Sequence, residues 1–193
     1  MKKICLLIMI FTAMGVKAQK WEKNYDFVDD CICGLSKVSK NGKIGYADRQ
    51  GKEVIPLLYS EGLTFNEGMV AVKKEGRWMY IDSTGKPITE AIFDDASSFD
   101  NGLAVAAKGG LYGYINITGD VVIPFQFSNA RPFTEELAPA ANIKGNWGFV
   151  DKKGDWIVKA QYGFVDNFAG NEARVMKGDK VFYIDKTNKV LHE

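Results

Sequence analysis

Short segments of alternating side chains, separated by turn signals, run through most of this 193-residue chain. The segment Trp78-Met79-Tyr80-Ile81 is rich in aromatic and β-branched residues, which favour strands. In a strand, Trp78 and Tyr80 would face one side of the sheet, while Met79 and Ile81 would face the other. Because both faces are apolar, both should be covered. No segment beyond the first 18 residues shows a sustained helical period.

The strand pattern recurs along the chain. One aromatic position returns at steps of 34, 34, 35 and 34 residues, in Tyr46, Tyr80, Tyr114, Phe149 and Tyr183. A second aromatic position, with a phenylalanine six residues after it, keeps the same register in Tyr59 and Phe65, Phe93 and Phe99, Phe127 and Phe133, and Tyr162 and Phe168. Such an internal period predicts a repeat protein. We expect Tyr80, Tyr114 and Phe149 to be buried against one another, and the phenylalanines Phe99, Phe133 and Phe168 to be buried as well.

A polar turn follows each aromatic strand position. It begins with Asp48, Asp82, Asn116, Asp151 or Asp185, and the first four of these turns carry a glycine three residues later, at Gly51, Gly85, Gly119 and Gly154. An Asp or Asn side chain can accept hydrogen bonds from turn amides, and glycine readily takes the positive φ that closes such a turn. The recurring acids are therefore interpreted as turn caps rather than as catalytic groups.

Each unit offers three short strands: the aromatic strand, a second strand after the turn, such as Val121-Val122-Ile123-Pro124, and a third that closes the unit, such as Leu103-Ala104-Val105-Ala106. A single unit cannot bury its aromatic faces, so neighbouring units must stack. The predicted fold class is all-β, a tandem array of about five three-stranded units of ~34 residues. An open, twisted or solenoid-like array is favoured because propeller blades usually need four strands and about 40 to 50 residues. A closed propeller is the alternative.

The fourth copy of the motif carries a family resemblance. The segment Asn146-Trp147-Gly148-Phe149-Val150-Asp151-Lys152-Lys153-Gly154-Asp155-Trp156-Ile157-Val158 resembles the WG (KWG) repeat family. The resemblance covers roughly residues 37–193, although the other copies depart at the name-giving pair, with Ile44-Gly45, Trp78-Met79, Tyr112-Gly113 and Val181-Phe182. It implies a bacterial, often exported protein with a binding or scaffold role, and it supplies no catalytic residues.

The N-terminal residues predict export. Lys2 and Lys3 precede the apolar run from Ile4 to Phe11, and Val16-Lys17-Ala18 offers a cleavage site. We expect a signal peptide at residues 1–18, a mature start at Gln19, a cap or tail at residues 19–36, and the repeat domain at residues 37–193. The apolar run is too short to span a bilayer. The location would be periplasmic or secreted; an uncleaved anchor or a buried N-terminal helix is the alternative.

Net charge gives no reason to expect a strongly charged partner. The chain carries 25 Lys and Arg against 24 Asp and Glu. Removal of Lys2, Lys3 and Lys17 with the signal peptide would leave 22 against 24, a net charge of −2. This balance does not favour nucleic acid or an anionic membrane. The expected partner is a protein or a glycan of the cell envelope.

Few residues suggest chemistry. His192 is the only histidine, which argues against Ser-His-Asp, Cys-His and histidine-rich metal schemes. Cys31 and Cys33 are too close for an unstrained disulfide and are interpreted as small apolar-like residues, with their oxidation state open. We predict no catalytic, cofactor or metal residues. Trp156 is the aromatic most open to a ligand role, and Trp21 lies outside the repeats.

The resulting hypothesis is a non-catalytic binding or scaffold module of the bacterial cell envelope. The alternative is a carboxylate-dependent hydrolase of envelope polysaccharide, because two suitably placed acids suffice for that reaction. A structural spacer is the third option. A deep cleft with two unpaired acids from different repeats would favour the hydrolase, a shallow apolar patch the binder, and a smooth charged surface the spacer.

Overall fold

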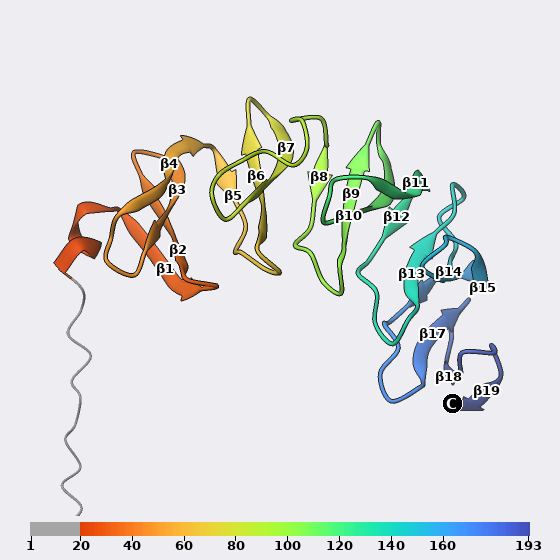
Figure 1. Cartoon of the computed structure of the whole chain (residues 1–193). Coiled ribbons are helices and arrows are strands. Elements are labelled where there is room, and N and C mark those ends of the chain that lie inside the picture. The colour runs from red at the N-terminus through yellow and green to blue at the C-terminus, as the bar shows by residue number, and fades with distance from the viewer. Residues whose placement is uncertain (1–19) are drawn as a thin grey trace, which may run out of the picture.

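The computed structural model describes residues 20–193, which form an open row of five antiparallel sheets (Figure 1). The row begins with a short 3-10 helix, η1 (Lys20–Asn24). No helix among residues 20–193 has the length and apolar character needed to cross a membrane. The expected signal peptide at residues 1–18 lies outside the described residues.

The five sheets follow one another along the chain, and each forms one structural unit. Unit 1 contains β1 (Phe27–Ile32), β2 (Leu35–Lys40), β3 (Lys43–Asp48) and β4 (Glu53–Tyr59). Unit 2 contains β5 (Glu61–Gly62), β6 (Met69–Lys74) and β7 (Arg77–Asp82). Unit 3 contains β8 (Asp95–Ala96), β9 (Leu103–Lys108), β10 (Leu111–Asn116) and β11 (Val121–Phe127). Unit 4 contains β12 (Asn129–Ala130), β13 (Ala138–Ala141), β14 (Trp147–Val150) and β15 (Trp156–Tyr162). Unit 5 contains β16 (Phe164–Val165), β17 (Ala173–Lys177), β18 (Lys180–Ile184) and β19 (Val190–His192).

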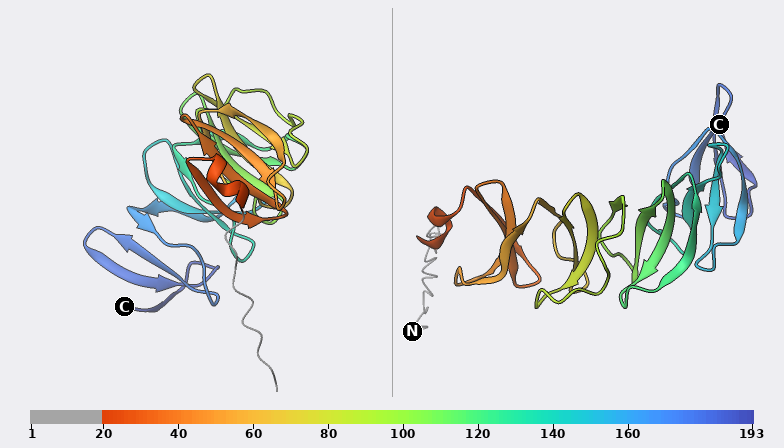
Figure 2. Two further views of the ribbon diagram at one scale, coloured as in Figure 1. Left: turned by 90° about the vertical axis from the view of Figure 1, so that its left-hand side faces the viewer. Right: turned by 90° about the horizontal axis from the view of Figure 1, so that it is seen from above.

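The all-β repeat array is confirmed, with two corrections of detail. Four of the sheets have four strands rather than three. In units 3, 4 and 5 the added strand is two residues long (β8, β12 and β16), too short to show a period in the sequence. The strand expected to close one unit instead belongs to the next sheet: β9 pairs in full register with β10, which carries the next aromatic position, Tyr114. The sheets do not close into a ring, and units 1 and 5 lie at opposite ends of the row (Figures 1 and 2).

The core lies between neighbouring units. The recurring aromatic is fully buried in Tyr80, Tyr114 and Phe149, as expected. These residues do not pack against one another, however. Each ring packs on the phenylalanine of the following unit, with centroid distances of 4.9 Å for Tyr46–Phe65, 5.0 Å for Tyr80–Phe99, 4.9 Å for Tyr114–Phe133 and 4.6 Å for Phe149–Phe168. Each of these aromatic pairs therefore joins two units and helps to hold the array together.

Hydrogen bonds strengthen the same joints. The hydroxyl of Tyr46 donates to the Leu63 carbonyl at 2.7 Å, that of Tyr80 to Ser97 at 2.8 Å, and that of Tyr114 to Arg131 at 2.9 Å. Each acceptor lies 17 residues further along the chain, in the next unit or at its start. Burial raises the pKa of all three phenols well above the ordinary value.

The polar turns are capped as predicted. The Oδ1 atom of Asp151 accepts the amides of Lys153 at 2.9 Å and Asp155 at 3.0 Å. Asn116 accepts the equivalent amides of Thr118 and Asp120 at 3.0 and 2.9 Å. The same pair of bonds forms at Asp48, Asp82 and Asp185. The turn glycines have positive φ as expected, with 86° at Gly85, 86° at Gly119 and 88° at Gly154.

Candidate functional site

Unit 2 departs from the repeat at its outer edge. In the other units the aromatic strand pairs with a strand after the turn, for example β10 with β11. In unit 2 only isolated bridges remain, Ile81 to Pro87 and Trp78 to Phe93. Pro87 has no amide proton to give to a ladder, and Thr89 stands where units 1, 3 and 4 carry Ile or Val. The Thr89 hydroxyl instead accepts the Tyr80 amide at 2.9 Å.

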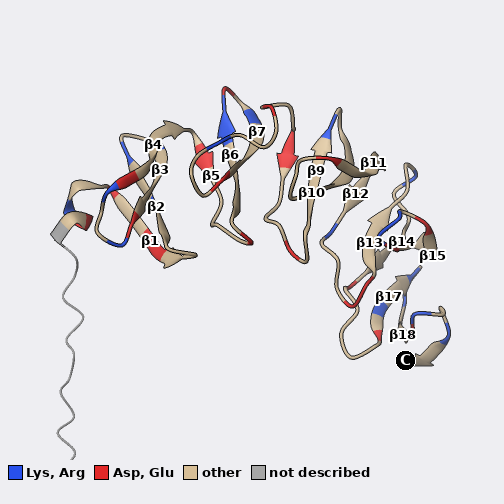
Figure 3. Cartoon of the chain, viewed as in Figure 1, with Lys and Arg blue, Asp and Glu red and all other residues tan. Residues whose placement is uncertain are grey.

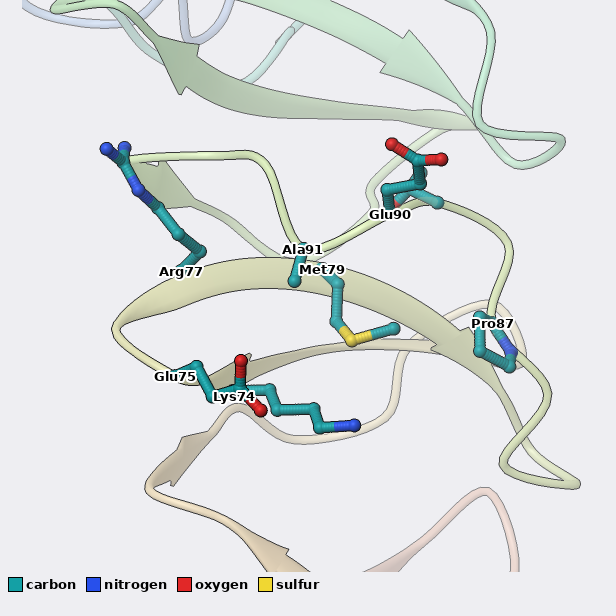
Figure 4. Close-up of a pocket in the computed structure, with 8 residues that line it drawn as sticks. Lys74, Glu75, Arg77, Met79, Pro87, Glu90 and Ala91 are labelled. Atoms are coloured by element: carbon teal, nitrogen blue, oxygen red, sulfur yellow. The ribbon is translucent and has the colours of Figure 1, made fainter.

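This departure leaves a hollow of about 460 Å³ beside β7 (Figure 4). Its apolar lining comes from Met79, Pro87 and Ala91, and its polar lining includes charged residues at both ends of the hollow. In Figure 4, Arg77 and Glu90 lie on the same side of β7 as Ala91, whereas Lys74 and Glu75 lie on the other side, at the β6–β7 turn. The volume lies in the usual range for sites that hold a small molecule or a short segment of a polymer.

The charges around this hollow are mostly free to meet a partner. Arg77 forms an ion pair with Asp94. No ion pair or side-chain hydrogen bond within residues 20–193 engages Lys74, Glu75 or Glu90. An apolar floor with unpaired charges of both signs suits recognition of an amphipathic ligand. The two acids, Glu75 and Glu90, belong to the same unit, so the hollow lacks the pair of acids from different repeats that would favour a hydrolase.

A second hollow, of about 490 Å³, lies where units 4 and 5 meet and contains several acids. Glu135 pairs with Lys186 at 3.2 Å, and Glu136 pairs with Lys152 at 2.9 Å. Asp151 is the turn cap described above. Hydrogen bonds from Lys186 and from the amides of unit 5 lower the pKa of Glu135, although partial desolvation opposes them. Because these acids are paired or capped, this hollow does not supply a catalytic pair either.

Two of the other turn acids, Asp82 and Asp185, have a lowered pKa. The hydroxyl of Thr84 and two turn amides lower the pKa of Asp82, and the corresponding groups around Thr187 lower that of Asp185. A lowered pKa keeps a carboxylate ionised, which suits an acceptor in a turn and not a general acid. The interpretation of these residues as turn caps therefore agrees with both geometry and charge.

The aromatic residues singled out in the sequence have structural contacts. Trp156 is half-buried and packs edge-on against Phe127 at 5.6 Å between centroids, within the joint of units 3 and 4. Trp21 donates from Nε1 to the Arg49 carbonyl at 3.3 Å and covers the turn at Gly51. Both indoles are half-buried, and a ligand role for Trp156 stays a prediction.

The remaining candidates are placed apart from one another. His192 contacts Glu172 at 3.1 Å and stacks on Tyr183 at 4.3 Å, in unit 5. Cys31 and Cys33 are free and exposed at the β1–β2 turn of unit 1. Among residues 20–193, no group of three or more His, Cys, Asp and Glu side chains is placed to hold a metal ion.

Comparison with protein families agrees with the repeat register found above. A family model for the WG containing repeat matches four times, at residues 44–78, 78–112, 112–142 and 147–180. The chain belongs to the WG repeat family. This WG repeat chain matches no curated protein.

Solved structures share the arrangement of strands with this WG repeat chain. Hsv2 of Kluyveromyces lactis is 11% identical with a TM-score of 0.51, over 82% of this chain and 59% of Hsv2. A eukaryotic initiation factor is 9% identical with a TM-score of 0.53, over 84% of this chain and 52% of that one. The WG repeat chain thus spans about three fifths or less of these structures. At such low identity the likeness concerns the fold alone.

Sequence reasoning missed the hollow of unit 2, although a signal for it was present. In units 1, 3 and 4 the second strand starts with a residue that has an amide proton and carries Ile or Val at the buried position. Unit 2 has Pro87 and Thr89 at these two positions. A copy that breaks the repeat at both positions should not form the same edge strand. The departure of one copy from its neighbours is therefore the feature that points to this site.

Proposed function

We propose that this WG repeat chain is a non-catalytic binding or scaffold module of the bacterial cell envelope, with a protein or a glycan as its ligand. The observation that carries the proposal is the hollow on unit 2. It combines an apolar floor at Met79, Pro87 and Ala91 with unpaired charges at Lys74 and Glu90. The regular units on either side would hold this hollow in a fixed frame.

The hydrolase alternative has less support. The acids that lie together in the second hollow are engaged in ion pairs or turn capping. Release of reducing ends from an envelope polysaccharide by the purified protein, and loss of that activity in Asp151→Asn, would nevertheless favour the hydrolase over the binding module.

Envelope localisation rests on the export signal at residues 1–18. We expect the mature protein to begin at Gln19, followed by the segment 19–36 and the repeat domain. Intact mass measurement on the periplasmic or secreted product would show this start. A product that retains Met1 and stays in the cytoplasm would contradict export.

The binding role can be tested by filling the hollow. Phe125 stands in unit 3 at the position that Ala91 holds in unit 2, so the repeat accepts an aromatic ring there. We expect Ala91→Phe to keep the fold and to abolish the binding that a glycan array or an envelope-protein array detects. Ala160→Phe makes the same change at the matching position of unit 4 and should leave binding intact. Equal binding by both variants and the unaltered protein would exclude the hollow as the binding site.

A further inference from the structure

The hairpin tips of the array carry a recurring lysine, which the near-neutral net charge of the chain does not reveal. Lys40, Lys74, Lys108 and Lys177 each end the strand before a tip, in units 1, 2, 3 and 5, and the first three keep the 34-residue step. In unit 4 that position is Asn142, and Lys144 follows two residues later. We call Lys40, Lys74, Lys108, Lys144 and Lys177 the tip lysines. Their recurrence gives each unit one cation at the same end of its sheet.

The tip lysines are exposed and almost wholly without partners. Within residues 20–193 none of them forms an ion pair, and Lys177 alone has a side-chain hydrogen bond, to Gln161 at 3.0 Å. The space beside several tip glycines is also open. A Cβ atom added at Gly42, Gly76 or Gly178 would meet nothing within 4 Å. Five cations are thus held on rigid hairpins with open space around them.

The opposite end of the sheets has acidic loops, which the protein uses internally. Figure 3 shows Lys and Arg at the β6–β7 and β9–β10 hairpins, and Asp and Glu on the loops at the other edge. The tip end also has acids: Glu75 lies in the β6–β7 turn, and Asp94 pairs with Arg77. In the loops at the other edge, Glu67 accepts the amide of Gly102 at 2.9 Å, and Glu135 accepts that of Gly170 at 2.7 Å. These acids join neighbouring units, whereas the tip lysines join nothing. The near-neutral net charge therefore conceals a row of exposed lysines at the tip end that form no ion pair within the described part of the chain.

We propose that the tip lysines form a binding surface for a linear acidic polysaccharide that lies along the row of hairpin tips. A linear chain with regularly spaced carboxylates can meet one cation per unit, and several weak exposed contacts add up along such a chain. This inference rests on the proposed binding role, and its surface shares only Lys74 with the hollow at Ala91. It names the ligand as a glycan, and assigns it to a carboxylated class.

Other polyanions fit the surface less well. Single-stranded nucleic acid is usually bound through aromatic side chains on which bases stack. The tip turns Asn41-Gly42 and Glu75-Gly76 carry no aromatic ring. A membrane surface is flat, whereas the units follow a curve (Figure 1), so a plane would not meet all five tips at once.

The test compares two variants that lose the same charge at opposite ends of the sheets. The first changes Lys40, Lys108 and Lys177 to Gln and keeps Lys74, because Lys74 also lines the hollow of unit 2. The matched control changes the exposed turn lysines Lys52, Lys86 and Lys189 to Gln. The probe is polygalacturonate, with uncharged dextran as the reference polymer. We expect the dissociation constant for polygalacturonate to rise about tenfold in the tip variant and to change little in the control. Binding by the unaltered protein should weaken as salt is raised from about 0.05 to about 0.3 M.

Equal losses in both variants, or no binding of polygalacturonate by the unaltered protein, would overturn the proposal. Tip-dependent binding that is tighter to single-stranded DNA or to phosphatidylglycerol vesicles would overturn the assignment to a polysaccharide. Ala91→Phe separates this inference from the proposed function, because it should leave polygalacturonate binding unchanged. No polygalacturonate binding by an unaltered protein that still binds its ligand at the hollow would show that only this inference had failed.

Discussion

In units 1 to 4, both ends use glycine at positive φ, yet the surroundings of the two ends differ. At the capped turns, a Cβ atom added to Gly119 would lie 2.5 Å from the Ile88 carbonyl oxygen, and one added to Gly154 would lie 2.8 Å from Ile123 Cγ2. At the hairpin tips, a Cβ atom added to Gly76 would meet nothing within 4 Å. The turn end of each unit is therefore packed on its neighbour, and the tip end is free.

This difference suggests that the turn ends hold the units together and that the tip ends are available to bind a ligand. In a repeat array, stability comes from the interfaces between adjacent units, because each unit contacts only its neighbours. The turn glycines, the aromatic pairs and the acidic loops all lie at such interfaces. At the tip end, Asp94 joins Arg77 of unit 2 to the Gly110 amide of unit 3, but the tip lysines form no ion pair with any described residue and are free to meet a ligand. Changes at the two ends should accordingly have very different effects.

The largest effect is expected from the aromatic joint. Phe133 is 3% exposed and packs on Tyr114 of the preceding unit. Phe133→Ala should lower the free energy of unfolding by about 3 to 5 kcal/mol, because it removes a buried ring and leaves a cavity. The control is Ile143→Ala at a tip, where the side chain is 77% exposed and the loss should stay within about 0.5 kcal/mol. Urea denaturation measures both; similar losses would refute the division between the ends.

The next effect concerns the glycines themselves. Gly119→Ala should cost about 2 to 3 kcal/mol, because it combines a strained backbone with a contact that forces the neighbouring unit to move. Gly76→Ala should cost only about 1 kcal/mol, since the backbone strain is the same and the space is open. Chemical denaturation of the two single variants gives the comparison. A larger loss at Gly76 would be incompatible with the packing described above.

A smaller effect should appear at the Tyr114 hydroxyl. Tyr114→Phe should cost about 1 kcal/mol at neutral pH through loss of the bond to the Arg131 carbonyl. Burial raises the pKa of Tyr114, so above about pH 10 the unfolded state releases a proton that the folded state keeps. The unaltered protein should then lose about 1.4 kcal/mol of stability per pH unit from this residue.

Tyr114→Phe removes that dependence, since the variant has no phenol at this position. The stability difference between the two proteins should therefore shrink above pH 10 and can reverse. Denaturation midpoints measured between pH 7 and about pH 11 test this expectation. A constant difference across the range would show that the phenol ionises equally in both states.

The smallest effect is expected at the capping residues. Asp151→Asn and the reciprocal Asn116→Asp should each change stability by less than about 0.5 kcal/mol, because either side chain accepts both turn amides. Thermal unfolding of the two variants is sufficient to measure this. Loss of a binding or hydrolytic activity without loss of fold in Asp151→Asn would assign the residue a role beyond capping.

The repeat, the turn caps and the buried aromatics could be predicted because each depends on local chemistry at a fixed spacing. Asp151 and Gly154 form the same turn wherever their pattern occurs. The pairing between strands was harder to predict from the sequence. The two residues of β8, Asp95–Ala96, show no period of their own, and their place in the sheet depends on the chain that folds back over unit 2.

The candidate surfaces were harder to predict because they arise from differences between copies or from placement in space. The hollow results from Pro87 and Thr89 acting together in one copy. The tips had a usable signal: Asn41-Gly42 is a typical two-residue hairpin turn, and its φ values of 50° and 69° confirm the conformation. Net charge could not show that the lysines beside such turns gather at one end.

Native-state hydrogen exchange tests the difference between the two ends most directly. The amides of Gly85, Gly119 and Gly154 donate to turn carbonyls at 2.9 Å and pack against the preceding unit. We predict that these amides exchange more slowly than those of the tip glycines Gly42, Gly76 and Gly178, with protection that falls when Phe133 is changed to Ala. Equal exchange at the turn and tip glycines would contradict the account, because it would mean that the turn end is no more tightly held than the tips.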